Sequence, residues 1–194
     1  FILNYVNHLP ENKYTVELII MNRTPQYLGE KLKREVKIHY VPERIKNPLG
    51  YNCRVNEIVK KGNYDILWCN FCTLSDITWL KAAKKYGIPV RIAHSHNSEN
   101  MGSKLVLISH LQHKKAISKY VTHFFACSDV AGKFMFGDNI VKQNNYCLIN
   151  NAIETDKYSY NENIRMKTRL DLKISDKIVI TNVGRFHFQK NHSF

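Results

Sequence analysis

Two histidines stand two positions apart, directly after a stretch that is typical of a buried strand. The stretch covers residues 90–93, and the histidines are His94 and His96. On an extended backbone, side chains two positions apart point to the same side, so we expect both imidazoles at one site. Imidazoles hold hydroxyl and phosphate groups, and with carboxylates they also bind catalytic metals. The pair predicts a substrate site or a metal-dependent hydrolase, and two exposed loop histidines are the alternative without a function.

A glycine, an arginine and a lysine follow the last apolar stretch, residues 177–183. Gly184 allows a sharp turn, Arg185 can bind a phosphate through two parallel hydrogen bonds, and Lys190 adds a charge near an expected helix start. The segment is neither a Walker loop nor a G-x-G-x-x-G loop. It predicts a phosphate site, although arginine and lysine also occur together by chance in a basic protein.

Cys69 and Cys72 form a C-x-x-C pair between an expected strand and an expected helix. A redox pair or half of a zinc site would have this form, because a helix N-terminus lowers a thiol pKa. Zinc needs a second ligand pair, and the other three cysteines stand alone, so two ordinary thiols are favoured. Five cysteines without regular spacing also argue against a disulfide framework and favour a reducing cytosol.

Residues 100–128 contain no Asp or Glu but carry four lysines, Lys104, Lys114, Lys115 and Lys119. A helix is expected over residues 104–120, with an imperfect apolar stripe that includes Leu111. Such a helix fits a surface of anionic lipid headgroups or, as the plainer alternative, a solvated basic face. Aromatic residues do not alternate with the lysines, so binding of single-stranded nucleic acid is not favoured.

These candidate residues depend on alternating strands and helices to bring them together. Strands are expected at residues 14–21, 36–41, 66–69, 90–93, 123–127, 146–150 and 177–183, most of them with helical patterns between them. Such alternation predicts a parallel α/β sheet with helices on both faces, and ligands bind at the carboxyl ends of its strands. His94, His96 and Arg185 all follow expected strands, so we place the chemistry there.

Composition limits the class of protein further. The chain has 194 residues, 44% of them hydrophobic, which excludes a disordered chain. Its 29 Lys and Arg against 16 Asp and Glu give a formal net charge of +13, so an anionic partner is expected. The apolar runs are far shorter than the roughly 20 residues of a membrane span.

Several stretches occur together in a characteristic order. They are residues 63–69 (NYDILWC), 87–97 (GIPVRIAHSHN), 125–128 (FACS), 149–158 (INNAIETDKY), 183–186 (VGRF) and 189–192 (QKNH). In this order and spacing, over nearly the whole chain, they resemble a bacterial glycosyltransferase of family 4, of the kind that builds capsular or extracellular polysaccharide. The resemblance implies the N-terminal half of a GT-B fold, in which two Rossmann-like domains face each other across a cleft.

The resemblance also implies an activity and its parts. A hexosyl group would pass from a nucleotide sugar, UDP- or GDP-linked, to a polysaccharide or lipid-linked acceptor, with retention of configuration and without a metal or other cofactor. Gly184, Arg185 and Lys190 would bind the donor diphosphate, whose growing charge fixed cations stabilise. His94 or His96 would line the sugar site as the catalytic histidine. Residues expected on the acceptor side or at the hinge are Asn97, Ser128, Asn150 and Asn151.

The chain departs from the family pattern at both ends. Residues 1–150 are expected to form the acceptor-side domain without its first strand, 151–176 an interdomain segment, and 177–194 the start of the nucleotide-sugar-binding domain. The chain begins with Phe1 rather than Met, so we expect a fragment that alone transfers no sugar.

The parent protein is expected in the cytoplasm, peripheral to the inner membrane face. Two other classes remain as alternatives: a non-catalytic basic module that binds nucleic acid or an anionic membrane, and the metal hydrolase built on His94 and His96.

Overall fold

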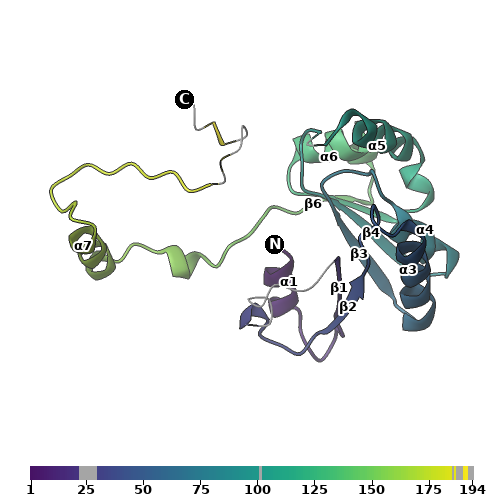
Figure 1. Cartoon of the computed structure of the whole chain (residues 1–194), viewed down its shortest axis with the longest axis horizontal. Helices are drawn as coiled ribbons and strands as arrows, with labels where there is room; N and C mark the ends of the chain where they lie inside the picture. The colour runs from purple at the N-terminus through teal and green to yellow at the C-terminus, as the bar shows by residue number, and fades with distance from the viewer. Residues whose placement is uncertain (22–29, 101, 185, 187–189, 192–194) are drawn as a thin grey trace. The chain divides into compact units, whose positions relative to one another are not determined.

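The computed structural model describes residues 1–21, 30–100, 102–184, 186, 190 and 191. Within them the chain divides into two compact units, Phe1–Ile153 and Glu154–Phe194. Figure 1 traces the chain through both units. Each unit is described by itself below.

The first unit contains two parallel sheets. A two-stranded sheet pairs β1 (Glu17–Met21) with β2 (Lys37–Val41). A four-stranded sheet has the order β3 (Ile66–Phe71), β4 (Val90–Ser95), β5 (His123–Ala126) and β6 (Tyr146–Leu148), and all its pairings are parallel. Parallel neighbours need crossover connections, and those within the four-stranded sheet contain the helices α4 (Thr78–Lys85), α5 (Lys104–Ala116) and α6 (Asp129–Phe136). The α/β architecture of parallel sheets flanked by helices is therefore confirmed.

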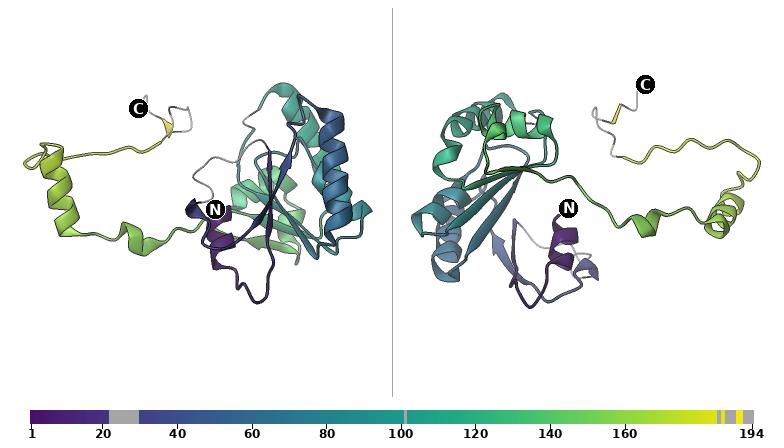
Figure 2. Two further views of the ribbon diagram at one scale, coloured as in Figure 1. Left: turned by 60° about the horizontal axis from the view of Figure 1, so that its bottom comes forward. Right: turned by 180° about the vertical axis from the view of Figure 1, so that it is seen from behind.

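Helices connect these strands and cover the four-stranded sheet. They are α1 (Ile2–His8), α3 (Pro48–Gly62), α4 (Thr78–Lys85), α5 (Lys104–Ala116) with η1 (Ile117–Lys119), and α6 (Asp129–Phe136) with η2 (Ile140–Lys142). Helices α3 and α4 lie together along one side of the sheet, and α1 lies near β1 and β2 on the other side (Figures 1 and 2).

The apolar core lies between the four-stranded sheet and the helices α3, α4 and α6. Strands contribute Leu67, Ala93 and Phe124, and their neighbours in sequence point to the opposite face because side chains alternate along a strand. Helices contribute a larger set of fully or nearly buried side chains, namely Tyr51, Val55, Ile58, Val59, Leu80, Ala82, Ala83, Met135 and Phe136. This packing fixes the strands whose carboxyl ends carry the candidate site.

Local hydrogen bonds set where these helices begin. The Asn47 side chain accepts a hydrogen bond from the Gly50 amide at 2.8 Å at the start of α3, and Pro48 occupies the first helical position. The helix ends at Asn63, whose φ of 46° is left-handed, a conformation that asparagine tolerates better than most residues. Ser103 and Ser128 cap α5 and α6 in the same manner as Asn47.

A polar cluster at the start of β1 connects the two sheets. The Glu17 carboxylate accepts hydrogen bonds from Tyr64 at 2.5 Å and Lys37 at 3.0 Å, and it lies 2.5 Å from His39 Nε2. Burial alone would raise the pKa of Glu17, but these partners lower it to about 2. Since Tyr64 lies two residues before β3, one carboxylate joins the β1–β2 pair to the larger sheet.

The second unit contains η3 (Thr155–Tyr158) and α7 (Glu162–Asp171). The strand predicted for residues 177–183 is wrong: Ile178 and Ile180 are 97% and 95% exposed, and this segment is not paired with another strand. A strand forms only beside a neighbour that shares its backbone hydrogen bonds, and the described part of this unit has none to offer.

Among the described residues, no helix is both long and apolar enough to cross a membrane.

Candidate active site

His94 is fully buried on the face of β4 that lies opposite the apolar core. Its strand neighbours Ala93 and Ser95 are also buried, so β4 is covered on both faces. The ring of His94 lies among other rings: centroid distances are 4.3 Å to His96, 4.7 Å to Phe1, 5.8 Å to Trp68 and 5.9 Å to Phe125. The Trp68 ring is stacked on it with an interplanar angle of 11°. Three strands and α1 thus build an aromatic cage around one imidazole.

Three buried nitrogen atoms of this cage have no hydrogen-bond partner among the described residues. Neither Nδ1 nor Nε2 of His94 has a hydrogen bond within the part of the chain that the structure describes, and the same holds for Trp68 Nε1. Buried polar groups are nearly always hydrogen-bonded, because an unpaired one costs free energy. The cage therefore offers one acceptor and two donors to a hydroxylated ligand or to water.

The cage also fixes the charge of His94. Burial, and secondly the neighbouring His96, lower the pKa of His94 from 6.5 to about 4. The ring is therefore neutral near pH 7, with one nitrogen that donates and one that accepts. A neutral imidazole can hold a sugar hydroxyl or act as a base, but it does not supply a positive charge.

His96 is placed differently. It is half-buried, its Nε2 donates to Asn70 Oδ1 at 2.8 Å, and its backbone amide donates to the Phe71 carbonyl at 2.9 Å. Burial lowers its pKa as well. The structure thus brings His94 and His96 together but gives them unequal surroundings: only His94 has both ring nitrogens open. Which of the two is catalytic stays a prediction.

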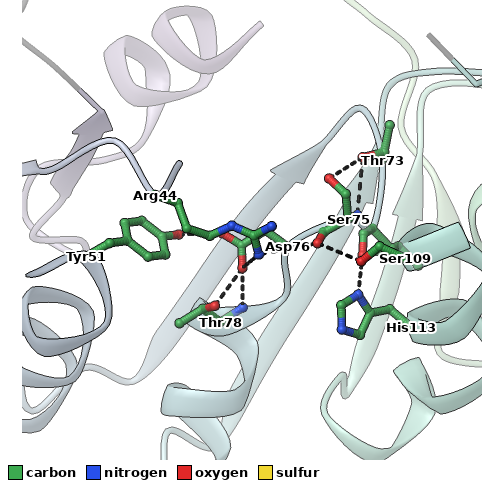
Figure 3. Close-up of polar contacts among 9 residues, drawn as sticks. Arg44, Tyr51, Thr73, Ser75, Asp76, Thr78, Ser109 and His113 are labelled. Carbon is green, nitrogen blue, oxygen red and sulfur yellow. Dashed lines mark hydrogen bonds and ion pairs between the residues drawn. The ribbon is translucent and has the colours of Figure 1, made fainter. Parts of the chain in front are cut away.

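A polar network braces the loop that follows β3 (Figure 3). Asp76 accepts hydrogen bonds from Tyr51 OH at 2.8 Å and from both the amide and the hydroxyl of Thr78, and it pairs with Arg44 at 3.3 Å. Burial alone would raise the pKa of Asp76, but these partners hold it below the ordinary value. Because its oxygens are already engaged, Asp76 acts as a positioning residue for the loop and the start of α4.

The same loop is attached to α5. Ser109 Oγ donates to the Ser75 carbonyl at 3.1 Å, and His113 Nδ1 donates to the Leu74 carbonyl at 2.6 Å (Figure 3). His110, fully buried, accepts a hydrogen bond from the Leu74 amide at 3.1 Å. The loop after β3 is therefore fixed on both sides, by α3 through Asp76 and by α5 through these three residues.

The residues predicted for the acceptor side or the hinge follow the carboxyl ends of β4, β5 and β6, and their role stays a prediction. Ser128 Oγ accepts from the Ala131 amide and caps α6, which is a structural role. Asn97 follows β4 closely, and its carbonyl lies 3.4 Å from Ser95 Oγ. Asn150 and Asn151 are exposed beyond the end of β6.

The predicted phosphate site belongs to the second unit. A Cβ atom built on Gly184 would lie 3.1 Å from Lys190 Cγ, so the lysine side chain passes directly over the glycine backbone. Arg185 lies outside the described residues. The role of these three residues stays a prediction.

Among the described residues, the cysteine pair has no partner that would support zinc chemistry. Cys69 and Cys72 are free thiols, and burial raises the pKa of Cys69 to about 12, the opposite of a reactive thiol. Within the described ranges, no group of three or more His, Cys, Asp or Glu is arranged to hold a metal ion.

One of the four lysines predicted to face a membrane points elsewhere. Lys114 Nζ donates to the carbonyls of Lys133 and Phe134 at 2.9 and 2.6 Å, so it binds the end of α6 rather than facing solvent. Last-turn carbonyls of a helix lack partners within the helix, and a cation satisfies them well. Lys104, Lys115 and Lys119 are exposed, as predicted.

Comparison with known proteins identifies the family of this chain. Residues 1–157 match Glycosyltransferase Family 4, and the chain belongs to that family. It is 27% identical over 202 aligned positions to a protein of Bacillus subtilis (strain 168) named "Putative glycosyltransferase EpsF". The alignment covers 100% of this chain and 52% of that relative, so the chain spans about half the relative's length. No solved structure matches the chain significantly.

Sequence reasoning found the two histidines but not the groups that enclose them. Phe1 and Trp68 contact His94, and Asn70 orients His96, yet these residues come from α1 and β3. The available signal was strand alternation: Trp68 and Asn70 share one face of β3, and the register pairs Asn70 with His94. The sequence does not tell which strands lie side by side in the sheet, so Trp68 and Asn70 could not be placed beside the histidines.

Proposed function

We propose that the protein to which this chain belongs is a retaining, metal-independent hexosyltransferase. It moves a sugar from a UDP- or GDP-linked donor to a polysaccharide or lipid-linked acceptor in capsule or extracellular polysaccharide synthesis. The observation that carries the proposal is the neutral, buried His94 with both ring nitrogens open, in a chain that belongs to family 4.

The cage suits a sugar better than a phosphate. A neutral imidazole and an indole N–H offer hydrogen bonds of both kinds but no charge, which matches hydroxyl groups. Aromatic faces beside them match the apolar C–H faces of a sugar ring, and they exclude water from the hydrogen bonds. The first unit would therefore hold the sugar or acceptor.

The charge for the leaving group comes from the second unit in this proposal. As the glycosidic bond to the donor diphosphate breaks, negative charge grows on the diphosphate oxygens. Arg185 and Lys190 would stabilise this charge, and Gly184 would let the backbone approach. No metal is required for that step, because the fixed cations take its place.

The proposal places the enzyme in the cytoplasm at the inner membrane face. A lipid-linked acceptor would present its diphosphate there, and a net charge of +13 favours contact with anionic lipids. The 194 residues by themselves are proposed to be inactive, since they span about half the length of the relative they match.

The test is a donor panel with the complete protein, in the presence of EDTA and a membrane fraction as the source of acceptor. Release of UDP or GDP from UDP-glucose, UDP-galactose, UDP-N-acetylglucosamine and GDP-mannose is followed, and the product anomer is assigned by NMR. We expect turnover of one donor with its anomeric configuration retained. Inversion, or turnover abolished by EDTA and restored by a divalent cation, would refute the mechanism, and turnover by the 194 residues alone would refute their inactivity.

A further inference from the structure

Helix α5 has polar side chains on the side that faces the protein and apolar side chains on the side that faces solvent. Four of its inward or half-buried side chains are polar, since Ser109, His110, His113 and Lys114 make hydrogen bonds to the loop after β3 and to the end of α6. Its outward face is apolar: Leu105, Ile108 and Leu111 are 78%, 52% and 48% exposed. Helices on a protein surface ordinarily show the reverse arrangement.

The exposed apolar residues share their face with lysines. Positions 104, 108, 111 and 115 follow one another at spacings of four, three and four, which places them on one side of a helix. Lys104 and Lys115 thus stand at the two ends of a row that contains Ile108 and Leu111, with Leu105 beside it. Lys119 in η1 adds a third exposed charge.

No acidic side chain balances these lysines locally, because residues 100–128 contain neither Asp nor Glu. A second copy of the chain is a poor partner for this face, since a symmetric contact would bring lysines against lysines. A surface that is anionic outside and apolar inside would match both the exposed lysines and the exposed apolar side chains of α5.

We infer that the outward face of α5 is a docking surface for an anionic phospholipid bilayer. Leu105, Ile108 and Leu111 enter the boundary between headgroups and acyl chains, and Lys104, Lys115 and Lys119 contact lipid phosphates. The helix, about 20 Å long for 13 residues, lies parallel to the membrane plane. The inference deepens the peripheral location proposed above and rests on it, but it does not depend on glycosyl transfer.

Vesicle flotation of the purified complete protein tests this surface without donor or acceptor. Vesicles contain either phosphatidylcholine alone or equal parts of phosphatidylcholine and phosphatidylglycerol. We expect binding to the anionic vesicles only. Lys115→Glu should weaken it by at least about five-fold, since one lysine near the surface is worth that factor. The double variant Leu105→Gln/Ile108→Gln should weaken it by about ten-fold or more.

Matched controls lie on other helices of the same unit. Leu49→Gln on α3 changes a leucine that is 79% exposed, as Leu105 is to 78%, and Lys81→Glu on α4 changes another exposed lysine. Both should bind like the wild type, and all variants should keep its melting temperature, because every changed side chain is exposed.

Three results would overturn the inference. One is the absence of binding to anionic vesicles, and another is loss of binding in the lysine variant but not in the leucine–isoleucine variant, which would show surface attraction without insertion. The third is a dimer in sedimentation that Leu105→Gln/Ile108→Gln dissociates, which would assign the face to a second copy. Failure of glycosyl transfer in the donor panel changes none of these readouts, so the two proposals are tested separately.

Discussion

Two buried histidines of the first unit differ in how they are used. His94 and His110 are 0% and 1% exposed, and burial lowers the pKa of each. His110 accepts a hydrogen bond from the Leu74 amide and stacks on Phe134 at a centroid distance of 4.8 Å, whereas His94 has no hydrogen bond within the described residues. Burial and a lowered pKa are therefore common to both rings, and the hydrogen bonds differ: His110 Nδ1 has a partner, whereas His110 Nε2 and both nitrogens of His94 have none among the described residues.

The sharpest test replaces each ring by one of similar size without nitrogens. His94→Phe in the complete protein should lower kcat by about 10²–10³-fold, the usual cost of removing one fixed hydrogen-bonding group at the reacting centre. His110→Phe should leave kcat within about three-fold of the wild type, since that ring faces the loop after β3 and α6. Steady-state kinetics with the active donor measures both, and equal losses in the two variants would remove the distinction.

Stability should respond in the reverse order. His110→Phe leaves the buried Leu74 amide without its acceptor, so it should lower the free energy of unfolding by about 1–3 kcal/mol. His94→Phe removes two nitrogens that had no partner, so its stability should be unchanged or raised by up to about 1 kcal/mol. Urea unfolding of both variants provides the comparison. A destabilised His94→Phe would indicate that the nitrogens are engaged in the free protein.

The pH dependence of stability should contain a contribution from His94. Its folded pKa of about 4 lies below the ordinary 6.5, so between these values the unfolded chain binds more protons than the folded one. Stability should therefore fall as the pH drops from 6.5 toward 4, and level off below that for this group. Urea midpoints across this range should change less with pH in His94→Phe. His96 and His110 act in the same direction, so the slope should become smaller but not vanish.

The smallest expected effect is a change in the free energy of unfolding when Lys114 or Lys115 of α5 is replaced. Lys114→Met removes the cation from the last-turn carbonyls of α6 and should cost about 1 kcal/mol. Lys115→Met, one position further along, changes an exposed side chain and should cost less than about 0.5 kcal/mol. Equal losses for the two variants in urea unfolding would contradict the assignment of Lys114 to the scaffold.

Sequence periodicity was sufficient for the α/β sheet and for placing the histidines at a strand end, because both depend on local patterns. It was insufficient where contacts with residues distant in the sequence determine the local structure. The helix expected after Cys72 begins only at Thr78, because Asp76 accepts a hydrogen bond from the Thr78 amide and the preceding residues form the loop after β3. Leu111 was expected in an imperfect apolar stripe whose direction stayed open, and the structure exposes Leu111 and buries His110. When a helix has apolar residues on several sides, its sequence does not indicate which side faces the core. A single sequence also does not indicate the order and register of the strands.

The division of the strands of the first unit into two sheets should determine which part of that unit unfolds first in local fluctuations. Within the described residues, no backbone pairing connects the β1–β2 ladder to the ladder of β3–β6. Side chains such as Glu17 and Tyr64 make the connection instead. Amide hydrogens of Leu18 and Ile38 should therefore exchange with solvent as one cooperative group, at a lower opening free energy than those of Ala93 and Phe124. Hydrogen exchange would reveal this part of the domain as a separate foldon, which detaches while the ladder that carries the histidine cage remains closed.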